Sequence, residues 1–336
     1  DYFNTVLYTG NSSTQAIAVG FQSDWVWCKP RTNTGSHFLS DSVRGGTKVI
    51  VSNTTATEIT RSNNIQSFTS TGYTLGADGT SNYNGDATVS WNWKAGTSFT
   101  NDASATGIGT IDSTGSVNTD AGFSIITYTG TGANATVAHG LSAIPKMIIL
   151  KSYSGSANWI VYHNSIGNGK ALSLNTTAAE SADAGYFNST TPTSTVFSLG
   201  NDGFSNGSSQ TIVAYCFAEK QGYSKFGSYT GNGNADGTFV YTGFKPAFVI
   251  QKEYGAAGEY WMMKDNKRVG YNQTDANLYP NASNAEGDTN GIDLLSNGFK
   301  CRTTGAGSNA SGATYIYMAF AENPFTTSTG VPATAR

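Results

Sequence analysis

The stretch Val89-Ser90-Trp91-Asn92-Trp93 decides the fold, because altered copies of it occur twice more along the chain. The counterparts are Val213-Ala214-Tyr215-Cys216-Phe217 and Ile316-Tyr317-Met318-Ala319-Phe320. Side chains alternate between the two faces of a strand, so the bulky first, third and fifth residues of each copy share one face. We expect this bulky face to be core, and each stretch to be the last strand of a repeated unit.

Five further blocks precede this strand in the same order in each copy. One is a strand that ends in Tyr-Thr-Gly, and the three phrases begin at Tyr8, Tyr128 and Tyr229. Another is an apolar run that predicts a central strand buried on both faces, and the three runs are residues 25–29, 147–151 and 248–252. Six blocks in one order, found three times, predict a threefold internal repeat.

The composition favours strands and tight turns over helices. The chain of 336 residues contains 40 glycines, and only 12% of its residues are charged. We therefore predict an all-β protein made of three tandem antiparallel β-sandwich-like repeats of about 100 residues each. The predicted divisions are repeat 1 (1–95), a linker with one hairpin (96–121), repeat 2 (122–220), repeat 3 (221–325) and a C-terminal tail (326–336).

Charge and hydropathy exclude two classes of partner. The formal net charge is −3 and the isoelectric point is about 5.6, so no basic field exists to collect the phosphates of a nucleic acid. No apolar run reaches the roughly 18 residues that a membrane-spanning helix needs. We expect neither nucleic-acid binding nor membrane insertion.

The cysteines and histidines do not have the spacing of a metal or redox site. Cys28, Cys216 and Cys301 occupy different positions of the repeat, and no Cys-x-x-Cys pair occurs. The three histidines include no His-x-x-x-His pair, which argues against a zinc site. We expect buried, free thiols and no cofactor.

Two acidic, glycine-rich loops are weak candidates for calcium binding. The candidate ligands are Asp78 and Asp86 in the first loop, and Asp288 and Asp293 in the second. Neither loop has the EF-hand spacing, so ordinary polar turns are the favoured interpretation.

The residues that enzymes of polysaccharide chemistry use are not paired in the sequence. Glu58, Glu180 and Glu286 occur once in each copy, whereas a glycosidase needs two carboxylates in one cleft. We therefore predict no catalytic residue. Tyr83 and Tyr186 lie in polar loops, and as exposed aromatic rings they are weak candidates for stacking on a sugar ring.

Longer phrases carry a resemblance to a known family. They are Tyr2–Asn11, Asp41–Gly45, Ala121–Ile125, Gly222–Gly233 and Tyr317–Phe325. In these phrases the chain resembles a poorly characterised family of virion-associated proteins from tailed phages of marine and freshwater bacteria, cyanophages included. The resemblance extends over essentially the whole chain, although Cys28 stands where many relatives have an aliphatic residue. It implies a location on the virion surface and brings no catalytic residues with it.

The resemblance and the repeat together predict a non-enzymatic structural protein on the outside of a phage particle. We expect a tail fibre or adhesion appendage that contacts a host-surface glycan or protein, forms a homo-oligomer, with a trimer favoured, and binds other virion proteins. The alternatives are a capsid decoration or head knob protein, a polysaccharide depolymerase, and a cellular surface filament or adhesin.

Overall fold

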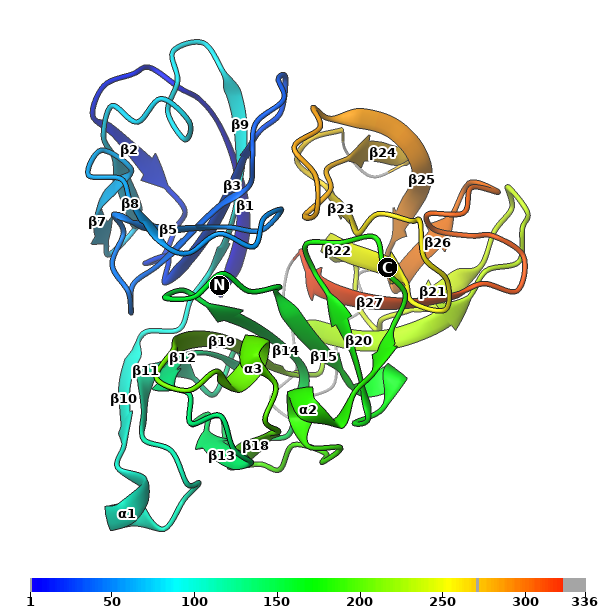
Figure 1. Cartoon of the computed structure of the whole chain (residues 1–336). Coiled ribbons are helices and arrows are strands. Elements are labelled where there is room, and N and C mark those ends of the chain that lie inside the picture. Colours follow the sequence, from blue (N-terminus) through cyan, green and yellow to red (C-terminus); the bar gives the residue numbers. More distant parts are fainter. Residues whose placement is uncertain (1, 270–271, 323–336) are drawn as a thin grey trace.

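The computed structural model describes residues 2–269 and 272–322, so the predicted tail lies outside the described residues. The fold is all-β, with 45% of the residues in strands and 5% in helices, and its sheets are antiparallel. Figure 1 shows three lobes around a common centre. We call them unit 1 (2–95), unit 2 (96–220) and unit 3 (221–322).

Unit 1 consists of two sheets. The larger has the strand order β1-β9-β3-β4-β5-β6, and the smaller has the order β2-β8-β7. The strands are β1 (Phe3–Thr9), β2 (Gln15–Ala18), β3 (Trp25–Pro30), β4 (Phe38–Asp41), β5 (Lys48–Val51), β6 (Ile59–Thr60), β7 (Ile65–Thr69), β8 (Gly72–Leu75) and β9 (Ala87–Trp93).

Unit 2 has a main sheet with the order β10-β11-β12-β19-β14-β15-β16-β17 and a small sheet of β13 and β18. Its strands are β10 (Thr97–Asn101), β11 (Ser113–Asn118), β12 (Phe123–Thr129), β13 (Ala135–Ala138), β14 (Pro145–Ser152), β15 (Ile160–His163), β16 (Lys170–Ser173), β17 (Ser181–Ala182), β18 (Val196–Leu199) and β19 (Thr211–Ala218). Its short helices are α1 (Ala103–Thr106), the 3-10 helix η1 (Asn164–Ile166), α2 (Ala184–Phe187) and α3 (Gly203–Asn206).

Unit 3 has two four-stranded sheets with the orders β20-β27-β22-β23 and β21-β26-β25-β24. The strands are β20 (Ser224–Thr230), β21 (Phe239–Tyr241), β22 (Pro246–Glu253), β23 (Met262–Asp265), β24 (Thr274–Asn277), β25 (Gly287–Leu295), β26 (Gly298–Cys301) and β27 (Thr314–Ala321).

The order of the main sheet is the same in the three units. The first strand pairs with the last strand, the last with the strand of the long apolar run, and that strand with the next along the chain: β1-β9-β3-β4, β12-β19-β14-β15 and β20-β27-β22-β23. This is the arrangement that a threefold repeat predicts. The division of the chain into repeats of common origin stays a prediction.

The largest hydrophobic core of the described chain lies between the units and takes side chains from all three. Trp91, Tyr215 and Met318 have equivalent positions in β9, β19 and β27, and all three lie in this core. The opposite faces of the main sheets line smaller cores inside the units, where Cys216 and Ala319 lie. The sequence predicts correctly that the bulky faces are core, but not that they meet in one shared core.

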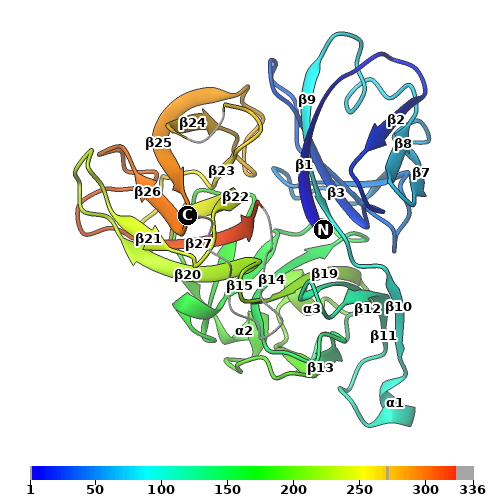
Figure 2. The same cartoon turned by 180° about the vertical axis from the view of Figure 1, so that it is seen from behind.

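The predicted linker is part of unit 2. Residues 96–121 contain the paired strands β10 and β11, and β11 pairs in turn with β12, so the hairpin extends the main sheet. In Figure 2 the hairpin ends in α1, which projects away from the body of the molecule. The segment after it pairs with the edge of the small sheet at Ile111 and Val137.

A tyrosine and an asparagine hold the first turn of each unit. The Tyr8, Tyr128 and Tyr229 hydroxyls donate to the carbonyl oxygens of Ser81, Ser205 and Ser308 at 2.6, 2.6 and 2.7 Å. The asparagine after each serine is buried, and its side chain bonds the turn that follows Tyr-Thr-Gly; these residues are Asn82, Asn206 and Asn309. The tyrosine of the phrase that marks the predicted repeat therefore forms one of the hydrogen bonds that hold this turn.

Candidate functional site

The three shared glutamates lie at the boundaries between units. Their backbone N–H groups donate to carbonyl oxygens of the adjoining unit: Glu58 to Tyr153, Glu180 to Tyr254 and Glu286 to Arg31, at 2.9, 2.9 and 2.8 Å. Because the third of these bonds returns to unit 1, the units close in a ring.

Buried ion pairs accompany two of these glutamates. Arg44 donates to Asp41 at 2.7 Å and to Glu58 at 2.8 Å, and Asp41 also accepts from the Tyr215 hydroxyl of unit 2 at 2.8 Å. The equivalent network in unit 3 consists of Asp265, Arg268, Glu286 and, from unit 1, Trp91. Unpaired burial of these charges would be costly, so their partners give them a structural role at the boundaries.

The cysteines are buried, free thiols, as predicted. Burial raises the pKa of Cys28 to about 12 and that of Cys301 to about 11, so neither is a thiolate at neutral pH. Burial also lowers the pKa of His139 and of His163 to about 4, which leaves both side chains neutral.

The calcium candidates are divided between unit 1 and unit 3. Asp78 accepts from the Thr80 and Ser81 backbone N–H groups at 2.9 and 3.0 Å, and thus caps its own turn. Burial acts to raise the pKa of Asp78, but these hydrogen bonds and the Arg61 charge outweigh it, and the pKa lies below its ordinary value. Asp293 pairs with Arg302 at 3.2 Å, and Asp288 is exposed on β25. Within residues 2–269 and 272–322, no three His, Cys, Asp or Glu side chains are grouped to hold a metal ion.

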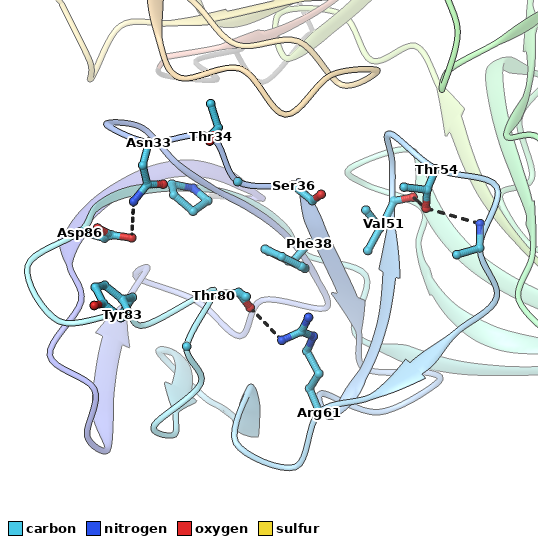
Figure 3. Close-up of a pocket in the computed structure, with 14 residues that line it drawn as sticks. Asn33, Thr34, Ser36, Phe38, Val51, Thr54, Arg61, Thr80, Tyr83 and Asp86 are labelled. Carbon is cyan, nitrogen blue, oxygen red and sulfur yellow. Dashed lines mark hydrogen bonds between the residues drawn. The ribbon is translucent and has the colours of Figure 1, made fainter.

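A pocket of about 680 Å³ opens in unit 1. Figure 3 shows its lining, which comes from the loop after β3, the start of β4, the end of β5 with the turn that follows it, the residue after β6 and the loop between β8 and β9. The lining includes the polar and aromatic side chains of Asn33, Phe38, Arg61, Thr80, Tyr83 and Asp86. Its volume lies in the range of small-molecule sites, roughly 300–1,000 Å³.

Tyr83 gives the pocket an exposed aromatic ring on a fixed backbone. Its side chain is 55% exposed, whereas the preceding Asn82 is completely buried. The Asn82 amide donates to the carbonyl oxygens of Ser13 and Gly76 at 2.6 and 2.8 Å, and so fixes the turn from which Tyr83 projects. A ring held in this way can stack on the apolar face of a sugar with little loss of conformational entropy.

Arg61 lies against the ring of Phe38, with its guanidinium carbon 5.1 Å from the ring centroid. Its Nη1 atom donates to Thr80 at 3.2 Å and to Asp78 at 3.4 Å. The Nε atom is buried and has no hydrogen-bond partner within the described residues. A buried donor without a partner costs free energy, and because this atom has no accessible surface it does not face the open pocket.

Asp86 and Asn33 add a hydrogen-bonding pair to the pocket. The Asn33 amide donates to Asp86 Oδ2 at 2.8 Å, as Figure 3 shows. A carboxylate accepts further hydrogen bonds from hydroxyl groups, and an amide both donates and accepts. The pocket thus combines an apolar platform with the polar groups that a carbohydrate needs.

The same place is filled in the other two units. In unit 2, α2 contacts α3 and β16, and Phe187 is buried against Tyr162 with ring centroids 5.5 Å apart. Phe204, at the position of Thr80, packs against the core of unit 2. In unit 3 the Met262 methyl group lies where a side chain at Gly307 would lie. The opening in unit 1 is therefore not a requirement of the fold.

The structure corrects the expectation for Tyr186. It lies in α2 rather than in an exposed loop, and it is half-buried against the core of unit 2. Its sequence neighbours are polar, but the helix packs the partly buried ring against the core of unit 2. Tyr186 thus belongs to the side chains that pack in unit 2 at the place that corresponds to the unit 1 pocket.

The sequence alone does not point to Arg61, Phe38 or Asn33 as site residues. No motif connects them, because they come from three segments that only the folded chain brings together. One signal was available at Tyr83, since the equivalent positions carry Gly207 and Ala310. A turn that accepts Gly and Ala does not need an aromatic ring for packing.

None of the helices formed by residues 2–269 and 272–322 has the length and apolar character to cross a membrane.

The fold and the pocket define an all-β protein of three units around a shared core, with a pocket in its first unit. The chain belongs to the family described as a domain of unknown function (DUF7483), whose model matches residues 1–324. Comparisons with curated proteins and with solved structures gave no match.

Proposed function

We propose that this protein is a non-enzymatic structural module on the surface of a tailed-phage particle, in a tail fibre or adhesion appendage, and that it binds a host-surface glycan in the pocket of unit 1. The observation that carries the binding role is the exposed Tyr83 ring above a pocket that units 2 and 3 fill with side chains. The virion location is supported by the resemblance of the long phrases along the chain.

The construction of the chain supports a rigid scaffold. The three units close in a ring, and the core between them contains all six tryptophans of the chain: Trp25, Trp27, Trp91, Trp93, Trp159 and Trp261. A module of this kind holds a binding pocket in a fixed position, which suits an adhesion appendage. Homotrimer formation is part of the proposal, because most soluble oligomers are symmetric assemblies of copies of one chain.

A specific feature favours capsid decoration as the second candidate. Phe239 and Tyr241 are 44% and 61% exposed on the edge strand β21. The equivalent positions carry Ala16 and Ala18 in unit 1, so the fold does not require aromatic residues there. Exposed aromatic pairs suit contacts with another protein, such as a capsid lattice.

Purified virions test the location. Gold-labelled antibodies against the chain should mark the tail or its fibres in electron micrographs, and quantitative mass spectrometry should give the low copy number of a fibre protein. A copy number close to that of the major capsid protein would favour decoration instead. Absence of the chain from washed particles would contradict both, and would favour a cellular adhesin.

Purified protein tests the binding role. It should adsorb to host cells and compete with phage adsorption, and the Tyr83→Ala variant should do so less well. Incubation with host capsule or lipopolysaccharide should release no new reducing ends. Release of reducing ends would establish a depolymerase and overturn the non-enzymatic proposal.

A further inference from the structure

A buried lysine of unit 3 contacts the side-chain amide of an asparagine. Lys264 on β23 and Asn277 on β24 have no exposed surface. The Lys264 Nζ atom donates to Asn277 Oδ1 at 2.5 Å, and the Met262 sulfur lies 3.9 Å from the same nitrogen. A lysine buried to this extent is usually paired with a carboxylate, whereas here its hydrogen-bond partner is a neutral amide.

The register of the two strands brings these side chains together. Met263 and Leu278 exchange both backbone hydrogen bonds, at 2.8 and 3.3 Å. The next pair along the strands, Lys264 and Asn277, is therefore a non-hydrogen-bonded pair, and side chains lie closest to each other at such positions. The contact thus follows from the backbone and not from a chance position of a long side chain.

Units 1 and 2 have other residues at the equivalent pair. The registers of β4 with β5 and of β15 with β16 place Ser40 opposite Val49 and Tyr162 opposite Ala171. None of these four residues is a lysine or an amide. The fold therefore does not require the pair that unit 3 contains.

We propose that Lys264 and Asn277 form an intramolecular amide crosslink. The neutral Nζ amine attacks Asn277 Cγ, a bond forms between Nζ and Cγ, and the bond between Cγ and Nδ2 breaks. Nδ2 leaves as ammonia together with the proton that Nζ loses, so a primary amine and a primary amide become a secondary amide and ammonia. The crosslink joins the two sheets of unit 3, since β23 and β24 belong to different sheets. It goes beyond the proposed function and does not depend on the pocket of unit 1.

The surroundings prepare both groups for this reaction. Burial lowers the pKa of Lys264 to about 7, so much of the amine is uncharged and nucleophilic at neutral pH. The leaving nitrogen is held by two acceptors, because Asn277 Nδ2 donates to the carbonyl oxygens of Asp275 and Thr289. The Asp275 carboxylate is close enough for its charge to act on Lys264, and it can carry the proton from Nζ to Nδ2. The product also removes a costly buried charge.

Mass spectrometry of the purified full chain tests the crosslink. We expect an intact mass that is lower than the sequence mass by one ammonia. Tryptic digestion should give a branched peptide in which Lys264 is joined to Asn277. A succinimide at an Asn-Gly sequence such as Asn84-Gly85 loses the same mass but gives no branched peptide. A chain of full sequence mass that trypsin cleaves after Lys264 would overturn the proposal, and would leave the proposed function as it stands.

Variants assign the loss of ammonia to this pair. Lys264→Arg keeps a cation but has no nucleophilic amine, so it should have the full mass of its sequence, as should Asn277→Ala. Lys151→Arg is the matched control, because the buried Lys151 donates to backbone carbonyl oxygens and should not affect the crosslink. Persistent loss of ammonia in Lys264→Arg would contradict the assignment. The branched peptide of the wild type decides the question even if a variant fails to fold.

Discussion

The indole N–H of Trp159 in unit 2 donates to the carbonyl oxygen of Val51 in unit 1, at 3.1 Å. Trp261 of unit 3 makes the equivalent bond to Ser173 of unit 2, also at 3.1 Å. Position 37 has the equivalent place in unit 1, where the histidine bonds to Trp27 instead. The residue before β15 and the residue before β23 thus each place an indole at a boundary, and these two bonds join unit 1 to unit 2 and unit 2 to unit 3.

Loss of the Trp159 bond should destabilise the whole chain. Trp159→Phe removes the indole donor and leaves the Val51 carbonyl with the long 3.5 Å bond from the Thr54 hydroxyl, at a cost of about 1–3 kcal/mol. Trp93→Phe is the control, since the Trp93 indole lies in the same core but its Nε1 atom has no hydrogen-bond partner. Urea unfolding should show a larger loss for Trp159→Phe, and equal losses would argue against the boundary bond.

Lys252 should be a source of instability at neutral pH. Its Nζ atom is buried without a hydrogen-bond partner, and burial lowers its pKa to about 8 despite the nearby Glu253 and Glu259. Lys252→Met should therefore raise the free energy of unfolding at about pH 7 by about 1–2 kcal/mol. Lys151→Met should lower it, because the Lys151 ammonium donates to Thr55 and Ala157. The idea fails if both variants change stability in the same direction.

The same lysine gives a pH dependence with a definite sign. The pKa of Lys252 is about 8 in the folded chain and roughly 10.4 in the unfolded chain, so between these values the unfolded chain binds more protons. The stability contributed by this group therefore rises as the pH rises through that window. The advantage of Lys252→Met over the wild type should shrink between about pH 7 and pH 10, and a constant advantage would contradict the assignment.

Acid should destabilise the protein through its buried histidines. Burial lowers the pKa of His163 to about 4, against a hydrogen bond with the Tyr317 carbonyl that acts in the opposite sense. The unfolded histidine has a pKa near 6.5, so stability falls as the pH falls from about 6.5 to about 4. His163→Gln should lose about 2 kcal/mol less than the wild type between about pH 7 and pH 5. Identical losses in the two proteins would show that His163 does not titrate in this way.

The hydrogen bonds of the Asn82 side chain should stabilise both the fold and the pocket. Asn82→Ala removes several buried hydrogen bonds and should cost about 2–4 kcal/mol. Asn84→Ala is the control, since Asn84 is exposed two residues further on. Thermal unfolding measures the difference. A cost for Asn82→Ala no greater than that for Asn84→Ala would show that the asparagine does not hold the turn.

The strands were predictable because their patterns are local. The alternation of Trp91 and Trp93 with smaller residues predicted one buried face, and the apolar run to Lys29 predicted a strand buried on both sides. The shared core was not predictable in the same way. Periodicity says which face is buried, but not which other sheet covers that face.

The site was only partly predictable. Tyr83 was found because an aromatic ring in a polar loop is unusual, and the same reasoning gave the wrong exposure for Tyr186, whose helix folds back on the core. Arg61 and Phe38 carried no local signal, since their role depends on a contact between the end of one strand and the start of another. Only the folded chain shows that the place filled in two units is open in the third.

The affinity of Tyr83→Ala for glycan tests the central claim most directly. Host-surface polysaccharide fragments should bind the wild type and should bind Tyr83→Ala at least about tenfold more weakly, because the stacking platform is lost. Tyr241→Ala is the matched control, since Tyr241 is 61% exposed but lies far from the pocket lining, on β21 of unit 3. A loss confined to Tyr83→Ala is the predicted result, and equal affinity of the wild type and Tyr83→Ala would contradict the account.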